Sequence, residues 1–367
     1  MKDERIAIFL PSLRGGGAER MMLNLAGGLA DHGVLVDLIL AQAEGPYLTD
    51  VPSNVRVIDL KSSRISLSLP ALTRYLRNNT PSALLSALTH CNLIAIFARF
   101  LSKCDCRLVI SERNTLSVSS KNIRSLRGYL IVRLARYFYP NSDALVAVSK
   151  GVADDVCDTM RFPEEKIHVI YNPVVTRELL KKQHEPLAHP WFSPGQPPVI
   201  LSTGRLVKQK DFSTLIYAFS KLHAQRPLRL MILGDGEERR LLQELCSSLG
   251  VVEDVAFTGF VDNPYQYMVH ADVFALSSRW EGLANVLIEA LVCGCPVVST
   301  DCPSGPREVL QGGEYGQLVP VGDVEQLAIS ILKVLDSPPD REKQKHRGSE
   351  FSQEKATLEY LAVLRGE

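Results

Sequence analysis

Short β-rich segments alternate with amphipathic helical segments along nearly the whole chain of 367 residues. Such alternation favours a parallel sheet covered by helices, because each helix returns the chain to the start of the next parallel strand. In the first half, the predicted strands are residues 5–10, 34–40, 55–60, 83–88, 107–111, 144–149 and 167–171. The pattern therefore predicts an α/β fold.

A proline-rich segment interrupts the alternation at residues 173–198. It contains five prolines between Pro186 and Pro198 and no clear hydrophobic period, which is typical of a linker. A second series then begins, with predicted strands at residues 199–203, 228–233, 256–260, 273–276 and 296–299 and helices at 211–222 and 237–249. We therefore predict two α/β domains and, from the apolar spacing in residues 351–364, a terminal amphipathic helix.

Charge is distributed unevenly, although the formal net charge is zero. Residues 61–142 contain 13 basic residues and only two acidic ones, Asp105 and Glu112. Such a surface can simply be solvated, but its density suggests an anionic partner such as a membrane surface or a phosphorylated acceptor. We do not expect a nucleic acid partner, because no nucleic-acid-binding module accompanies the charge.

The chain begins with mixed charges and has no uninterrupted apolar run of about 18 residues, so neither a secretory signal nor a membrane-spanning helix is expected. None of the eight cysteines forms a Cys-x-x-Cys pair, and no histidine joins them at a zinc spacing. We expect reduced thiols in a cytoplasmic protein, with no metal site.

Three glycines, at positions 15–17, separate the first predicted strand from its helix. Glycines at such a turn let backbone N–H groups approach an anion at the positive end of the helix, although many strand–helix turns are glycine-rich without binding anything. The spacing is not Gly-x-Gly-x-x-Gly, which argues against a dinucleotide site. A second pair, Gly234 and Gly236, is more simply interpreted as a tight turn.

Two cations, Arg205 and Lys210, lie on the predicted loop after the strand at residues 199–203. Loops at the carboxyl ends of parallel strands are where open α/β sheets bind ligands. Two cations there could neutralise a diphosphate and stabilise the charge that develops when a diphosphate leaves. The alternative is a solvated basic loop.

Two carboxylates, Glu281 and Glu289, are separated by seven residues. The apolar spacing predicts a helix that begins near Leu283, so Glu281 precedes the helix and Glu289 lies about two turns into it. The two groups are therefore too far apart to share a proton, and they suit different parts of an extended ligand. For Glu289, a position on the helix surface without function is the alternative.

Four segments, taken in order, resemble the motifs of retaining family-4 glycosyltransferases of the GT-B fold. They are residues 16–20 (GGAER), 204–210 (GRLVKQK), 281–289 and 303–308 (PSGPRE), and the match covers nearly the whole chain. The resemblance is strongest to enzymes that build bacterial lipid-linked glycans and lipopolysaccharide core, which transfer N-acetylhexosamine or galactose. It implies a UDP-sugar donor and a lipid-linked or lipopolysaccharide glycan acceptor.

The resemblance also implies an architecture. Two Rossmann-like domains would face each other across a cleft, with an acceptor domain at residues 1–180 and a nucleotide-sugar donor domain at 181–345. Residues 346–367 would form a helix that packs back on the N-terminal domain.

Roles follow from the resemblance, residue by residue. Arg205 and Lys210 would hold the donor diphosphate with the backbone of Gly16 and Gly17. Glu281 would face the transferred sugar and stabilise its oxocarbenium-like transition state, so that Glu281, Arg205 and Lys210 form the catalytic set. The remaining donor contacts would be Glu289 with the ribose, the backbone of Phe260 and Val261 with the base, and Gly282, Leu283, Ala284 and Asn285 with the nucleotide sugar.

One departure from the family concerns the acceptor side. Many relatives carry a histidine after the strand that corresponds to residues 107–111, whereas this chain has Glu112, Arg113 and Asn114 there. Arg113 and Asn114 become the acceptor-side candidates, and His90 is predicted to lie elsewhere. Retaining enzymes of this kind are thought to pass the acceptor proton to the leaving phosphate, so no protein base is required. The chain has no Asp-x-Asp, and we expect neither a metal nor another cofactor.

Two other functions stay open at this point. The first is a nicotinamide-dependent oxidoreductase with a Rossmann domain, and the second is a non-catalytic homologue of a glycosyltransferase. The missing Gly-x-Gly-x-x-Gly motif argues against the first, and the complete set of Arg205, Lys210, Glu281 and Glu289 argues against the second.

A basic tract at residues 121–139 contains five cations and no acid. A basic amphipathic helix of this composition is predicted to lie on an anionic membrane surface, which would make the protein peripheral on the inner face of the cell membrane. The predicted apolar stripe consists of Leu126, Leu130, Ile131, Leu134 and Phe138. The alternative is that this stripe packs on the protein itself.

Overall fold

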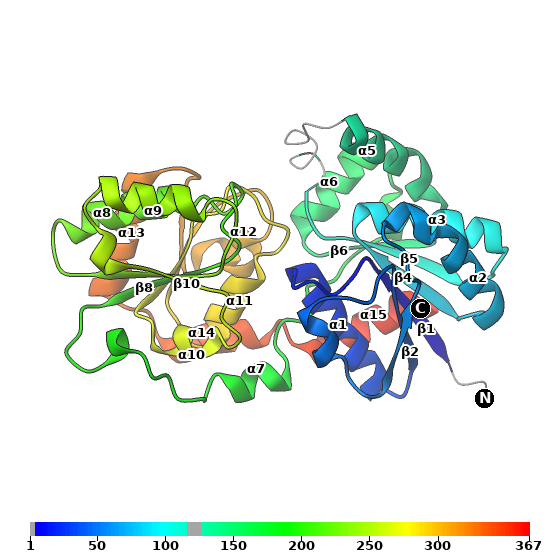
Figure 1. Ribbon diagram of the computed structural model, residues 1–367, viewed down its shortest axis with the longest axis horizontal. Helices are drawn as coiled ribbons and strands as arrows, with labels where there is room; N and C mark the ends of the chain where they lie inside the picture. The colour runs from blue at the N-terminus through cyan, green and yellow to red at the C-terminus, as the bar shows by residue number, and fades with distance from the viewer. Residues whose placement is uncertain (1–3, 116, 118–125) are drawn as a thin grey trace. The chain divides into compact units, whose positions relative to one another are not determined.

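The computed structural model describes residues 4–115, 117 and 126–367. The chain divides into two compact units. The first unit comprises Met1–Val174 together with Ser352–Glu367, and the second comprises Val175–Phe351. Each unit consists of a sheet with helices packed against it (Figure 1). The predicted α/β fold with two Rossmann-like domains is confirmed.

The first unit contains a parallel sheet of seven strands in the order β3-β2-β1-β4-β5-β6-β7. The strands are β1 (Arg5–Leu10), β2 (Leu35–Leu40), β3 (Val55–Asp59), β4 (Ala83–Ala87), β5 (Arg107–Glu112), β6 (Ala144–Ala147) and β7 (Ile167–Val169). The principal helices are α1 (Gly17–Asp31), α2 (Leu69–Asn79), α3 (Thr89–Ser102), α5 (Leu126–Phe138), α6 (Lys150–Met160) and α15 (Gln353–Arg365). The order of the strands reverses between β1 and β4, which is the kind of switch point where open α/β sheets bind ligands.

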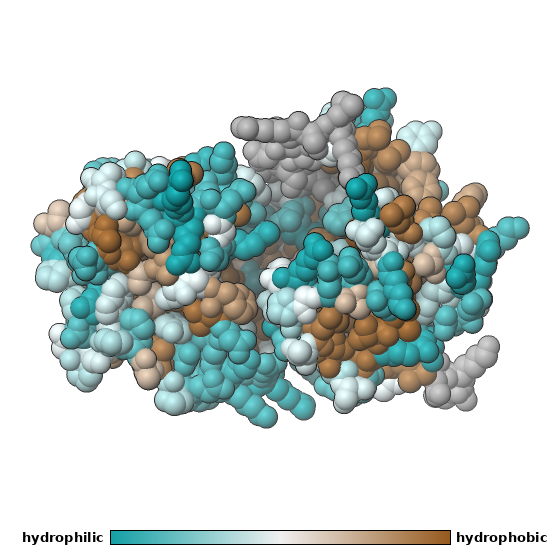
Figure 2. Space-filling model, in the orientation of Figure 1, coloured by the Kyte–Doolittle hydropathy of each residue, from teal (hydrophilic) through white to brown (hydrophobic). Residues whose placement is uncertain are grey.

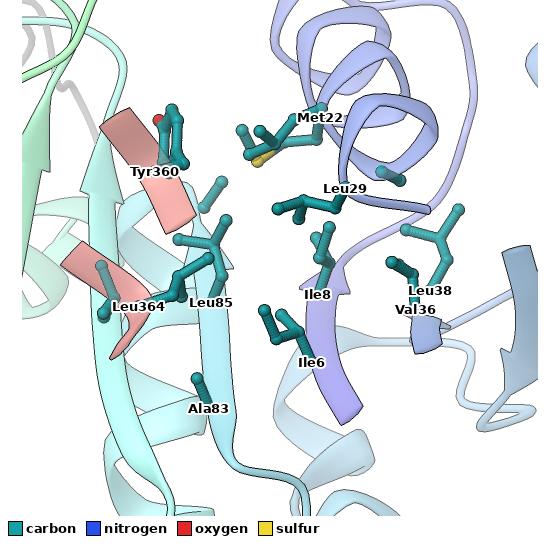
Figure 3. Packing of buried hydrophobic residues seen from close by; sticks show 14 of the residues in the cluster. Ile6, Ile8, Met22, Leu29, Val36, Leu38, Ala83, Leu85, Tyr360 and Leu364 are labelled. Carbon is teal, nitrogen blue, oxygen red and sulfur yellow. The ribbon is translucent and has the colours of Figure 1, made fainter. Parts of the chain in front are cut away.

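The core of the first unit explains why these segments fold as they do. Ile8 of β1 lies beside Leu29 of α1 (Figure 3), and both belong to a cluster with Ile6 and Met22 in which all four side chains are fully buried. A parallel sheet covered on both faces needs apolar residues at successive positions, and β1 is buried from Ile6 to Leu10.

The terminal helix α15 belongs to the first unit, where it packs on α1. A Cβ at Gly28 of α1 would lie 2.2 Å from Oγ1 of Thr357, so only glycine allows this approach of the two helices. Asn24 of α1 donates through Nδ2 to the carbonyl of Pro173 at 2.9 Å, and Gln353 donates to the carbonyl of Asn24 at 2.5 Å. The return of the C-terminal helix to the N-terminal unit, which the resemblance implies, is therefore observed.

The chain passes from one unit to the other at Val174–Val175 and returns at Phe351–Ser352, whereas the boundaries inferred from the sequence follow residues 180 and 345. Helix α7 (Arg177–Lys182) is part of the second unit, because Asn263 donates to the carbonyl of Lys182 at 2.9 Å.

The second unit contains a parallel sheet of six strands in the order β10-β9-β8-β11-β12-β13. The strands are β8 (Val199–Thr203), β9 (Arg229–Leu233), β10 (Val255–Gly259), β11 (Val273–Leu276), β12 (Val297–Thr300) and β13 (Gln317–Val319). The remaining helices are α8 (Phe212–His223), α9 (Arg239–Ser248), α10 (Tyr265–His270), α11 (Asn285–Val292), α12 (Pro306–Val309), α13 (Val324–Asp336) and α14 (Arg341–Ser349). Strand β13 was not predicted from the sequence.

In the part of the chain that the structure describes, no helix has both the length and the apolar character needed to span a membrane.

Candidate functional site

The loops that follow β8, β9, β11 and β12 gather at the carboxyl edge of the second sheet. Strand order reverses between β8 and β11, which are neighbours in the sheet although they are far apart in the sequence. The carboxylate of Asp272, just before β11, accepts a hydrogen bond from the N–H of Val199 at the start of β8. The loop with Arg205 and Lys210 follows β8, and the loop with Glu281 follows β11. The predicted donor residues of these two loops therefore lie at the switch point of the sheet.

Lys210 and Glu281 form an ion pair across this switch point. Nζ of Lys210 is 2.6 Å from Oε1 of Glu281, which also accepts a hydrogen bond from Oγ of Ser278 at 2.7 Å. The two charged side chains are only 16% and 9% exposed. Since an ammonium group has three N–H donors, Lys210 can bind Glu281 and still donate to an anion. The sequence assigned these residues to different parts of a ligand and did not reveal that they contact each other.

Arg205 is exposed on the same loop as Lys210. The backbone around it is fixed by hydrogen bonds from the N–H of Gly204 to the carbonyl of Leu233 and from the N–H of Leu206 to the carbonyl of Asp235, both at 2.9 Å. The exposed Arg205 is thus carried by a hydrogen-bonded loop. A cation held this way is available to an anionic ligand.

Glycine allows the loops after β8 and β9 to touch. Gly234 has a φ of +135°, and a Cβ on it would lie 2.1 Å from the carbonyl oxygen of Gly204. This contact gives Gly234 a structural role in shaping the loop that carries Arg205 and Lys210. The turn at Gly234 and Gly236 was interpreted from sequence as a simple tight turn, and its close contact with the β8 loop could not be read from the sequence.

The start of helix α11 completes this group of loops. Gly282, Leu283 and Ala284 are buried, and Ser304 donates through Oγ to the carbonyl of Gly282 at 2.9 Å. Ala284 is the N-cap of α11 and its side chain forms no capping hydrogen bond. Backbone N–H groups at a helix start suit an anion.

Glu289 lies nearer the start of its helix than the sequence suggested. The helix was predicted to begin near Leu283, but α11 begins at Asn285, so Glu289 is about one turn into it rather than two. Its side chain is partly buried. The later start follows from Ala284, whose φ of +64° is not helical.

Phe260 and Val261 follow β10 at the same edge of the sheet. The side chain of Phe260 is 69% exposed, although it is large and apolar. An exposed aromatic ring is a surface on which a planar base can stack.

The glycine loop of the first unit is engaged by the chain itself. The N–H groups of Gly15 and Gly16 donate to Oε2 of Glu19 at 2.9 and 3.0 Å, and Glu19 is 9% exposed. Glutamate at this position of a helix start satisfies its free N–H groups. The sequence assigned the Gly16 backbone to a ligand diphosphate, but in the structure its N–H group already has a carboxylate partner. Gly17 is the first residue of α1.

Glu112 and Arg113 are both buried at the carboxyl end of β5, whereas Asn114 is exposed. Glu112 accepts hydrogen bonds from the hydroxyl of Tyr139, from Nδ2 of Asn92 at 3.2 Å and from Oγ1 of Thr89 at 3.3 Å. Burial raises the pKa of Glu112 to about 7, although these donors act in the opposite direction. Glu112 was not singled out from the sequence as a site residue.

Arg113 donates through Nη1 to Oδ1 of Asn172, while its buried Nε and Nη2 have no hydrogen-bond partner. Burial lowers the pKa of Arg113. Of the two acceptor-side candidates, Asn114 is therefore the accessible one, and Arg113 lies beneath the surface.

His90 does not occupy the loop after β5, in agreement with its position in the sequence. It is in the first turn of α3, directly after β4, and β4 pairs with β5 through Ala87 and Ser111. The residue before it, Thr89, donates to Glu112. The sequence did not reveal that the strands of residues 83–88 and 107–111 are neighbours, which brings the segment of His90 next to that of Glu112.

We expect the stability of the protein to depend on pH through Glu112. Its pKa in the folded state is above the ordinary value, so its contribution is fully present below about pH 4.5 and is lost as the pH rises through about 7. Relative to a Glu112→Gln variant, the wild type should lose up to about 3 kcal/mol of unfolding free energy between pH 5 and pH 8. Urea unfolding of both proteins across this pH range measures the difference in their unfolding free energies. A difference that does not change with pH would contradict the raised pKa of Glu112.

No group of three or more His, Cys, Asp or Glu side chains within residues 4–115, 117 and 126–367 is arranged to hold a metal ion.

Comparison with known proteins gives a consistent result for both units. The family model "Glycosyltransferase Family 4" matches residues 15–178, and "Glycosyl transferases group 1" matches residues 185–351. The chain is 32% identical over 380 residues to the N-acetylgalactosamine-N,N'-diacetylbacillosaminyl-diphospho-undecaprenol 4-alpha-N-acetylgalactosaminyltransferase of Campylobacter jejuni, covering 99% of this chain and 100% of that protein.

One further relative and one solved structure give a result consistent with these matches. The lipopolysaccharide core biosynthesis glycosyltransferase LpsE of Rhizobium meliloti is 30% identical over 358 residues, with 95% of this chain and 96% of LpsE covered. The crystal structure of HepE from Anabaena, in complex with UDP and glucose, has a TM-score of 0.77 at 20% identity and covers 99% of this chain and 100% of HepE. At that identity the likeness to HepE establishes the fold alone.

Proposed function

Because the chain belongs to the family-4 glycosyltransferases and has the GT-B fold, we propose that it transfers a hexose or N-acetylhexosamine from a nucleotide-diphosphate sugar with retention of the anomeric configuration. We propose UDP as the nucleotide and a lipid-linked or lipopolysaccharide glycan as the acceptor. The names of the Campylobacter and Rhizobium relatives support such an acceptor, and the UDP bound to HepE supports the donor.

The observation that carries the proposal is the pairing of Lys210 with Glu281 beside the exposed Arg205, at the switch point of the second sheet. Arg205 and Lys210 would bind the diphosphate. As the bond between the sugar and the diphosphate breaks, negative charge grows on the phosphate oxygen, and fixed cations stabilise it more in the transition state than before. Two such cations make a bound divalent metal unnecessary in this proposal, and no other cofactor is invoked.

Glu281 would face the transferred sugar. Its carboxylate is held in place by Lys210 and Ser278, so it can accept a sugar hydroxyl and oppose the positive charge of an oxocarbenium-like transition state without rearranging. The buried backbone of Gly282, Leu283 and Ala284 and the neighbouring Asn285 would line the nucleotide sugar. Gly17 stays a candidate for a contact with the anionic donor. The N–H of Gly16 would have to give up its hydrogen bond to Glu19 before it could donate to a ligand.

The acceptor would be held in the first unit, with Asn114 at the surface and Arg113 supporting it from beneath. In the proposed front-side reaction, the bond from the anomeric carbon to the donor phosphate breaks and a bond to the acceptor oxygen forms on the same face. The acceptor proton passes to the leaving phosphate oxygen. No side chain of the protein is needed as a base.

The two alternative functions are distinguished by simple measurements. Family membership argues against a nicotinamide-dependent oxidoreductase, and we expect UDP but not NADH to raise the melting temperature. A non-catalytic homologue would bind UDP without turnover, so a screen for product formation across UDP- and GDP-sugars tests the transferase itself.

We expect Arg205→Ala to weaken UDP binding about 10- to 150-fold, because a charge-assisted hydrogen bond to the diphosphate is lost. Isothermal titration of UDP against the wild type and the variant measures the change. Lys221→Ala provides a control, because Lys221 is a half-exposed cation on α8 that pairs with Glu325. Unchanged UDP affinity in folded Arg205→Ala would remove Arg205 from the site.

We expect Glu289→Gln to abolish most of the preference for UDP over its 2′-deoxy analogue. A carboxylate that accepts from the ribose hydroxyl contributes about 1.5–3 kcal/mol, and an amide contributes less. Affinities of both nucleotides for both proteins form the test. If the preference persists undiminished in the variant, Glu289 does not bind the ribose.

We also propose that the protein is cytoplasmic and peripheral on the inner face of the cell membrane. An acceptor anchored in the bilayer would then share one plane with the enzyme. The part of the basic tract at residues 121–125 lies outside the described residues, so the argument depends on α5 and its neighbours.

A further inference from the structure

Arg113 is a charged residue inside the first unit. Figure 2 shows hydrophilic residues on the surface of both units, where water stabilises their charges. Arg113, which directly follows β5, is by contrast only 7% exposed. An arginine keeps its positive charge in a protein, so this position buries a cation.

One edge of the Arg113 guanidinium is free. Nη1 donates to Oδ1 of Asn172, whereas Nε and Nη2 are buried and form no hydrogen bond with any residue that the structure describes. The N–H groups of Nε and Nη2 lie side by side on one edge of the guanidinium plane. Two parallel N–H groups of this kind bind both oxygens of a carboxylate or a phosphate group. The free edge is therefore the one best suited to an oxyanion.

The charge of Arg113 also lacks a counter-charge. Within residues 4–115, 117 and 126–367, its guanidinium bonds only to Asn172, which is a neutral amide. The adjacent carboxyl group, that of Glu112, is bound elsewhere, since Tyr139 and Asn92 donate to it. A buried charge without a partner costs a large amount of free energy, so the site favours a ligand of opposite charge.

Two buried hydroxyl groups on the same side of β5 have no partner either. Tyr360 of α15 and Ser111 of β5 are both 0% exposed, and neither hydroxyl bonds to a described residue. Tyr360 (Figure 3) belongs to the core cluster that includes Val109, and Ser111 and Arg113 follow Val109 at intervals of two residues. Burial lowers the pKa of Arg113, and the phenol of Tyr360 opposes this shift, which places the two groups near each other.

We propose that Arg113 is the centre of a binding site for an oxyanion, a carboxylate or phosphate group that accepts hydrogen bonds from Nε and Nη2 and from the hydroxyls of Tyr360 and Ser111. Such an anion would provide the counter-charge and would satisfy these buried donors together. The inference rests on the proposed function only in the origin of the anion, because a free oxyanion and an anionic group of the acceptor have the same chemistry. The site is distinct from Arg205 and Lys210, which belong to the second unit.

Ordered water fits the Arg113 site less well. Buried waters are common, and a water molecule could accept from Nε or Nη2. Water carries no charge, however, so it would leave the guanidinium without a counter-charge in a place shielded from solvent. An oxyanion satisfies both the charge and the N–H groups.

The experiment measures the melting temperature of the full-length protein as phosphate or acetate replaces chloride at constant ionic strength. The wild type should show a saturable rise, of roughly 2–5 °C at about ten times the Kd of the anion. Arg113→Lys keeps the cation but loses the two parallel N–H groups, so it should weaken anion binding at least about tenfold. Arg113→Gln should abolish the saturable rise, and Tyr360→Phe should weaken binding by roughly tenfold.

A second buried arginine provides the matched control. Arg347 is 9% exposed, but its guanidinium donates to the carboxylate of Glu350 and to two backbone carbonyls. Arg347→Gln should therefore lower the melting temperature by the same amount in every buffer and keep the saturable rise.

The double variant Arg205→Ala, Lys210→Ala separates the inference from the proposed function. It removes the cations of the donor loops but leaves Arg113, so it should keep the saturable rise even though UDP binding is lost. Glucose 1-phosphate and inorganic phosphate, compared in this variant, identify the origin of the anion. Tighter binding of the sugar phosphate indicates an acceptor group, and binding of inorganic phosphate alone indicates a free anion.

Either of two results would overturn the inference. One is a wild-type melting temperature that shows no saturable rise with phosphate or acetate relative to chloride. The other is a saturable rise of equal size and midpoint in the wild type and in Arg113→Lys. If Arg113→Gln does not fold, Arg113→Lys and Tyr360→Phe still decide the question.

Discussion

Replacing Lys210 with alanine is expected to lower kcat/KM for sugar transfer by about 10²- to 10³-fold, because the group that stabilises charge on the leaving diphosphate is removed. The effect should fall mainly on kcat, since charge develops in the transition state. Steady-state kinetics with the best donor from the UDP-sugar screen provide the measurement. Lys208→Ala is the matched control, because Lys208 is an exposed cation on the same loop.

Loss of Lys210 also leaves the carboxylate of Glu281 without its cation. That side chain is 9% exposed, so part of the effect of Lys210→Ala could come from a displaced Glu281. Glu281→Gln separates the two, because it keeps a hydrogen-bond acceptor for Lys210 and Ser278 but removes the charge. We expect Glu281→Gln to retain UDP affinity and lose turnover. A folded Lys210→Ala enzyme with wild-type kcat/KM would exclude Lys210 from catalysis.

Chelation by EDTA should leave the turnover of the wild type intact, since the proposed charge stabilisation comes from Arg205 and Lys210. In the Lys210→Ala variant, added magnesium should not restore activity. Complete loss of wild-type turnover in EDTA, recovered with magnesium or manganese, would contradict the metal-independent mechanism.

The hydrophobic pattern predicted every strand of both sheets except β13, because a strand that is buried on both faces is a short apolar run in the sequence. It also located the loops with Arg205, Lys210 and Glu281, since each directly follows a predicted strand. The contact between Lys210 and Glu281 could not be predicted, because it depends on β8 and β11 being neighbours in the sheet. The local sequence does not determine the order of strands in a sheet.

Other contacts were missed for the same reason. His90 and Glu112 follow different strands, and only the pairing of β4 with β5 brings their segments together. The apolar stripe predicted for α5 includes Phe138, whose ring packs on Phe97 of α3. Packing and membrane binding both require an apolar row of residues, so the sequence could not separate them, and membrane binding stays a prediction. The partner of Gly15 and Gly16 could have been found, because a glutamate three residues after a helix start is a known capping residue.

Gly234→Ala is expected to have the largest effect on the fold of the donor loops. A φ of +135° is accessible almost only to glycine, and the new Cβ would lie 2.1 Å from the carbonyl oxygen of Gly204. Neither atom belongs to a flexible side chain, so the backbone of one loop must move. We expect a loss of roughly 3–5 kcal/mol in unfolding free energy, from backbone strain and overpacking together.

The same substitution should reduce UDP affinity, because the displaced loop carries Arg205 and Lys210. Gly250→Ala is the matched control, since Gly250 also has a positive φ, of +69°, but a Cβ there would meet nothing within 4 Å. The control should cost only about 1–2 kcal/mol and leave UDP affinity unchanged. Urea unfolding of both variants measures the change in unfolding free energy, and UDP titration measures the change in affinity. If Gly234→Ala is as stable as Gly250→Ala and binds UDP like the wild type, close contact between the β8 and β9 loops does not shape the donor site.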